Sequence, residues 1–268
     1  MIKKVSMNDK KHTAIIEFLA QKWWFYLIIL ICFFIPSFST RPITDPGEIS
    51  ILIMEVLQKP ITMNFHMVFP AVKILTLLLI AGLFVFKNKI ARFVLGFFTL
   101  LSLFVAVFQN MGFTNTYGFS VLIGNVMLQI VAAAFLFYET ITAKSDFSHP
   151  GRPWWKYMVI PFALFAFWMP MNQQGGPDFN PLLIITNESM VTYCMLTPVM
   201  ISILTLYHPS VNRPVLRVIS FIAMLYGIMN FITWFFINPE FWWIGVLHIP
   251  LYCVSIYGFV LSFIPGKA

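Results

Sequence analysis

Long apolar stretches, separated by short polar segments, make up most of this chain. A helix rises about 1.5 Å per residue, so about 20 apolar residues cross a bilayer core of about 30 Å. The pattern predicts an all-α integral membrane protein with eight transmembrane helices. The predicted spans are residues 23–39, 61–86, 93–111, 118–138, 155–171, 189–207, 218–237 and 241–263.

Basic residues fall mainly in alternate loops of this eight-span arrangement. Of the 17 Lys and Arg residues, fourteen lie on the side of the amino terminus, Arg41 and Lys59 lie on the other side, and Lys73 lies within a span. Cytoplasmic loops carry such an excess of positive charge. We therefore predict that both termini are cytoplasmic and that the chain is a multi-pass protein of the cell inner (plasma) membrane. Residues 1–21 are predicted to be a cytoplasmic amphipathic N-terminal segment.

Composition agrees with a membrane protein and excludes an ordinary soluble domain. Hydrophobic residues make up 59% of the chain and charged residues only 10%, and the mean hydropathy is +0.83. Soluble domains carry about a quarter charged residues. The net charge of +7 follows the membrane topology, so we expect the lipid bilayer as a partner and no nucleic acid. The three cysteines all lie in predicted spans and do not form a disulfide framework.

Two loops on the outer side carry signals for short helices. Asp45, Pro46 and Glu48 form a typical helix start, and the helix they open is predicted to run to about Gln58. This helix is apolar, so we expect it to lie in the membrane interface or to dip back into the membrane. A comparable polar start followed by a short apolar stretch occupies residues 180–188.

Several short motifs recur between the two halves of the chain. The pattern Trp-Trp-x-Tyr begins at Trp23 and again at Trp154, and Ile-Leu-Thr-Leu follows both Pro70 and Pro198 within five residues. We therefore predict two four-helix repeats, residues 22–144 and 145–268. Because each repeat has an even number of spans, the two would be parallel and related by an axis along the membrane normal.

A polar stripe marks the second span. Thr62, His66, Lys73 and Thr76 recur at helical spacing, and Lys73 lies near the middle of the membrane. A lysine at this depth is costly unless it faces protein, water or an anion. Lys73 is therefore the main candidate for a functional residue.

Other polar residues in the spans would lie at a similar depth in the outer half of the membrane. Asn125 and Gln129 share one face of the fourth span, and His248 lies in the eighth. We predict that they line a cavity open to the outside, under an acidic rim of Asp178, Glu188 and Glu240. The predicted substrate-binding residues are His66, Lys73, Asn125, Gln129 and His248.

Alternative roles exist for each of these residues. Amides and histidines in membrane helices often only hydrogen-bond neighbouring helices, and Lys73 could pair with an acid of another helix. His66 and His248 could ligate Cu(I) or haem, although no HxxxH or CxxC spacing supports this. Soluble-enzyme motifs such as GxSxG, HExxH and the P-loop are absent from the sequence. We therefore predict no catalytic residues, no metal ligands and no cofactor.

The favoured function is a carrier or substrate-binding subunit for a small anionic solute taken from the extracytoplasmic side. Lys73 would supply the counter-charge, and the histidines would donate hydrogen bonds or respond to protons. One alternative is a membrane anchor or assembly subunit that binds partner subunits through its polar stripes. Another is an intramembrane haem protein, metal protein or enzyme.

Overall fold

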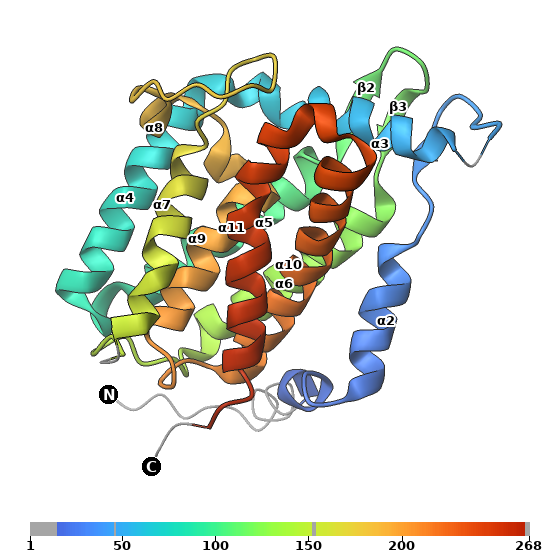
Figure 1. The fold of residues 1–268 in the computed structure, drawn as a ribbon. Coiled ribbons are helices and arrows are strands. Elements are labelled where there is room, and N and C mark those ends of the chain that lie inside the picture. Colours follow the sequence, from blue (N-terminus) through green and yellow to red (C-terminus); the bar gives the residue numbers. More distant parts are fainter. Residues whose placement is uncertain (1–14, 46, 152–153, 266–268) are drawn as a thin grey trace.

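A computed structural model describes residues 15–45, 47–151 and 154–265, so most of the predicted segment 1–21 lies outside the described residues. The protein is mostly helical (Figure 1). Residues 15–19 are helical, and the α-helices that follow them are α2 (Trp23–Phe33), α3 (Glu48–Gln58), α4 (Phe69–Phe86), α5 (Asn88–Phe108), α6 (Ile123–Thr142), α7 (Val159–Trp168), α8 (Leu183–Thr186), α9 (Tyr193–Leu206), α10 (Arg213–Ile232) and α11 (Trp242–Leu261). Short 3-10 or π turns extend them: η1 (Ile61–Val68), η2 (Trp154–Met158), η3 (Ser189–Val191), η4 (Thr233–Ile237) and η5 (Pro239–Phe241).

Five of these helical segments are long and apolar enough to cross a membrane. They are Ile61–Phe86, Asn88–Phe108, Ile123–Thr142, Arg213–Ile237 and Pro239–Leu261. A sixth span results if Leu183–Val191 and Tyr193–Leu206, which meet at an angle of 94°, are counted together. The remaining two predicted spans correspond to shorter helices, α2 with 11 residues and α7 with 10. The protein thus has the helices of a multi-pass membrane protein.

A small antiparallel sheet departs from the all-α expectation. Strands β2 (Met111–Thr114) and β3 (Gly118–Val121) form a hairpin, and β1 (Phe38–Ser39) pairs with the other edge of β3. The predicted span 118–138 therefore begins too early, because its first residues are in a strand. Gly118 has a positive φ of 71°, which glycine adopts readily, and it lets the chain reverse between the strands.

Helix α3 matches the expected short helix and covers the sheet. It runs across one end of the bundle, beside the β2–β3 hairpin (Figure 1). Its Leu52 and Val56 pack with Tyr117 and Leu122 in a small separate core. We call this end of the bundle, which also carries α8, the hairpin end. The opposite end is called the basic end, because Lys87, Lys144 and Arg213 lie there, next to the ends of α4, α6 and α10.

The main core lies in the middle of the bundle. Helix α9 is buried along almost its whole length, and α5 packs along α6 as α10 does along α11. By contrast, α4 and α2 lie at opposite edges of the bundle (Figure 1), and most of their large apolar side chains are exposed. An exposed apolar helix face is the expected surface toward lipid.

Backbone contact between α10 and α11 depends on Gly227. A Cβ atom at this position would lie 2.9 Å from the Cα of Tyr252, so no side chain fits without separating the helices. Small residues at such crossings let membrane helices approach closely. Gly96 in α5 is different, because a Cβ there would meet only the Thr140 methyl group at an ordinary 3.5 Å.

We therefore predict that Gly227→Ala lowers the stability of the detergent-solubilised protein by about 1–3 kcal/mol, as overpacking does. Gly96→Ala is the matched control and should be neutral or slightly stabilising, because alanine favours helix. The thermal unfolding midpoints of the two variants measure the difference. Equal midpoints would show that the α10–α11 contact tolerates a methyl group.

Candidate functional site

Lys73 is buried inside the protein, with 1% of its surface exposed. It lies in the first turns of α4, and its ammonium Nζ donates a hydrogen bond of 2.8 Å to the main-chain carbonyl of Leu183. A second hydrogen bond goes to the side-chain Oδ1 of Asn187. The ring of Phe167 lies on another side, with its centroid 4.9 Å from Nζ. All three partners come from the second half of the chain.

Asn187 ties the lysine to the end of α7. That helix ends at Met169, which has a left-handed conformation (φ 49°, ψ 67°), and the last carbonyls of a helix lack partners within it. The Nδ2 of Asn187 donates to the carbonyls of Trp168 and Met169, at 2.6 and 3.0 Å. Ser189 Oγ donates to the Phe167 carbonyl at 2.7 Å. The segment 183–191 is therefore a cap that supplies hydrogen-bond partners both to the end of α7 and to Lys73.

No carboxylate of the described residues contacts the ammonium group of Lys73. Within the described ranges, the one ion pair closer than 4 Å joins Lys144 and Glu17 at the basic end. Glu188 follows Asn187 in the sequence and acts on Lys73 through its electrostatic field only. A buried ammonium surrounded by neutral groups keeps much of its desolvation cost. In place of the acid that the alternative interpretation expects, the ammonium contacts an amide, a carbonyl and an aromatic ring.

The two predicted histidines make local contacts. His66 is exposed in η1, with its Nδ1 3.2 Å from the Met63 carbonyl oxygen. The Nδ1 of His248 lies 2.7 Å from the Ile244 carbonyl one turn earlier in α11. In the part of the chain that the structure covers, neither ring hydrogen-bonds to Lys73.

Asn125 and Gln129 belong to a different polar cluster, where α5 and α6 meet the second half of the chain. Gln129 Oε1 accepts a hydrogen bond of 2.9 Å from Asn110, and Asn125 Oδ1 accepts one of 3.2 Å from the Tyr226 hydroxyl. Asn110 Oδ1 and the Tyr193 hydroxyl are buried in this region without a hydrogen-bond partner. The structure thus distributes the five predicted residues over several places, with Lys73 at one of them and the two amides at another.

Two buried residues were not identified as important from the sequence. Asn187 lies in the short stretch 180–188, and nothing in its local pattern reveals a partner 114 residues away. Glu139 is fully buried at the basic end, where its oxygens accept hydrogen bonds of 2.6 Å from the Ser145 N–H and the Asn212 side chain. Its position in the last turn of an apolar helix is the signal that could have identified it.

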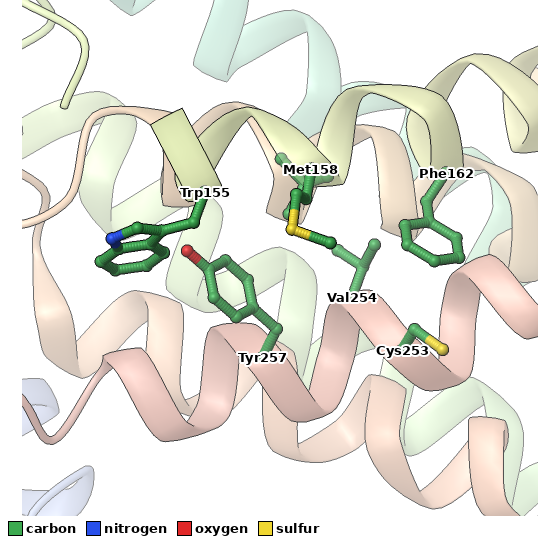
Figure 2. Close-up of a pocket in the computed structure, with 7 residues that line it drawn as sticks. Trp155, Met158, Phe162, Cys253, Val254 and Tyr257 are labelled. Atoms are coloured by element: carbon green, nitrogen blue, oxygen red, sulfur yellow. The ribbon is translucent and has the colours of Figure 1, made fainter. Parts of the chain in front are cut away.

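Two apolar cavities lie along α7. One, of about 220 Å³, lies between α7 and α11 and is lined by residues that include Trp155, Met158, Val254 and Tyr257 (Figure 2). The other, of about 400 Å³, lies between α4, α7 and α8, with Leu77, Phe167 and Ile184 in its wall. Only the second shares a residue with the Lys73 site, because Phe167 belongs to both.

No metal centre is formed by the described parts of the chain, where no three His, Cys, Asp or Glu side chains lie close enough to hold an ion. Comparison with known proteins gives no relative: no protein-family model, no curated protein and no solved structure matches this chain. The site must therefore be interpreted from its own chemistry.

A double-mutant cycle tests the contact between Lys73 and Asn187. Asn187→Leu alone leaves the ammonium without one acceptor and should cost about 1.5–3 kcal/mol of unfolding free energy. Replacing both partners, with Lys73→Met and Asn187→Leu, should cost less than the sum of the single changes, with a coupling energy of at least about 1 kcal/mol. The free energies are measured by SDS titration of the purified protein.

The matched control for this cycle pairs Asn187→Leu with Lys59→Met, which removes an exposed lysine at the hairpin end. Those two changes should add within about 0.5 kcal/mol. Additivity in the Lys73 cycle as well would mean that the contact carries no stability of its own.

Proposed function

We propose that this protein is a membrane carrier or substrate-binding subunit for a small anionic solute, with Lys73 as the group that binds the anion. The observation that carries the proposal is the buried ammonium with neutral partners and, among the described residues, no contacting carboxylate. Such a cation is strongly stabilised by an anion, because the anion supplies the charge that the surrounding groups lack.

The cap 183–191 would control access to the lysine. It joins α9 at a 94° break, where Thr192 has an extended conformation. An anion would replace the Leu183 carbonyl and the Asn187 amide as hydrogen-bond acceptors for Nζ. The exposed His66 and the partly exposed His248 would assist solute capture, and Asn125 and Gln129 would act from their separate polar cluster.

For the topology we propose eight spans in two parallel four-helix repeats, with the hairpin end facing the extracytoplasmic side of the plasma membrane. Eight helical segments occupy the positions of the eight predicted spans, with α2 and α7 as the short ones. The concentration of Lys and Arg residues at the basic end supports a cytoplasmic position for that end.

A second candidate is an anchor or assembly subunit of a larger complex. It is supported by the contacts of Asn110 with Gln129 and of Asn125 with Tyr226, which use polar groups to join helices and leave them less free for a solute. Purification in mild detergent separates the two candidates, because an anchor subunit copurifies with its partners in a fixed ratio.

Binding of acetate and inorganic phosphate to the protein in lipid nanodiscs tests the first proposal. The wild-type chain should bind at least one of these anions, and Lys73→Met should weaken that binding by at least about tenfold, since it removes a charged hydrogen-bond donor. Isothermal titration calorimetry measures both affinities.

Lys59→Met is the matched control, because it removes one positive charge from the exposed surface at the hairpin end. Its affinity should remain within about twofold of wild type, which corresponds to a small change in binding free energy. Failure of the wild-type chain to bind either anion, or full binding by folded Lys73→Met, would overturn the proposal.

A further inference from the structure

The larger apolar cavity forms a groove where α4, α7 and α8 meet. We call it the α7 groove. It has a volume of about 400 Å³, and its wall consists of aliphatic and aromatic side chains, among them Leu77, Leu164, Phe167 and Ile184. The indole N–H of Trp168, which also lies in the wall, already donates to the Asn180 carbonyl at 3.2 Å. The groove therefore suits a hydrocarbon occupant in volume and in chemistry.

The α7 groove adjoins the Lys73 site through all three elements that form it. Leu77 lies one helical turn after Lys73 on the same face of α4. Phe167 presents its ring to the ammonium and also lines the groove. Ile184 follows Leu183, whose carbonyl accepts a hydrogen bond from Nζ. The ammonium of Lys73 and the α7 groove are therefore neighbours, formed by the same three elements.

The groove reaches the surface that faces lipid. Leu164 in α7 is 60% exposed and Leu77 in α4 is 41% exposed, and both helices are apolar. A molecule in the lipid could therefore place an apolar chain in the groove without crossing an aqueous region. Its polar end would then lie beside the cap 183–191, which covers Lys73.

We propose that the solute bound by Lys73 is an amphipathic anion with a single alkyl chain, whose chain occupies the α7 groove and whose charged end replaces the cap as partner of the ammonium. This inference rests on the proposed anion-binding function and adds the chemical class of its substrate. A cation beside an apolar groove is complementary to an anion that carries a hydrocarbon chain.

Straight-chain carboxylates of increasing length test this inference in nanodiscs. Acetate, butyrate, hexanoate and octanoate carry the same head group, so a change in affinity reports the chain alone. Each added CH₂ should tighten binding by about two- to fourfold while the chain fills the groove. Nanodiscs containing Lys73→Met give the background that arises from partition into lipid.

Leu77→Trp should fill part of the groove and abolish the dependence on chain length, lowering octanoate affinity by at least about tenfold, while acetate affinity stays within about twofold. Leu78→Trp is the matched control, because Leu78 is the next residue of α4, is 64% exposed and is not in the groove wall. Should Leu77→Trp fail to fold, Leu164→Ala removes a wall side chain and should weaken octanoate by about threefold or more.

The outcomes separate the two proposals. Binding that depends on Lys73 but is equal for acetate and octanoate would overturn the amphipathic substrate and leave the anion site standing. An unchanged chain-length dependence in Leu77→Trp or in folded Leu164→Ala would do the same. If no anion, acetate and phosphate included, binds in a way that depends on Lys73, the proposed function itself is overturned.

Discussion

The hydrogen bonding of one buried ammonium group joins helix α4 to the second half of this protein. Lys73 lies on an edge helix whose other side chains are mostly apolar, so its partners must come from elsewhere in the chain. They come from the segment 183–191, which folds back over α4 and α7. Without that segment, both the ammonium and the final carbonyls of α7 would lose these hydrogen-bond partners.

The same segment explains why α7 can be so short. This helix of 10 residues leaves its final carbonyls without partners inside the helix. Asn187 and Ser189 hydrogen-bond those carbonyls from outside the helix. A broken helix is tolerated at membrane depth when protein groups satisfy the freed backbone, and the charged side chain is part of this arrangement.

The sequence pattern predicts local features of this protein well. The helix α3 has the bounds that the Asp45–Glu48 signal indicates, and Lys73 is buried, as expected for a charged residue within an apolar stretch. Polar partners across the chain are not predictable in this way, because hydropathy contains no information on which helices are neighbours. The contact of Asn187 with Lys73 and the separation of Asn125 from that site both depend on packing. The hairpin at residues 111–121 is not predictable from the pattern either, because a short apolar strand resembles the start of an apolar helix.

The glycine at position 227 affects how the molecule can move. Because the backbones of α10 and α11 are in direct contact at Gly227, the two helices are closely packed and cannot readily slide or tilt against each other. We therefore expect them to act as a fixed frame. Any rearrangement during solute exchange would then involve α4, α7 and the segment 183–191, whose mutual contacts are much less extensive than those between α10 and α11.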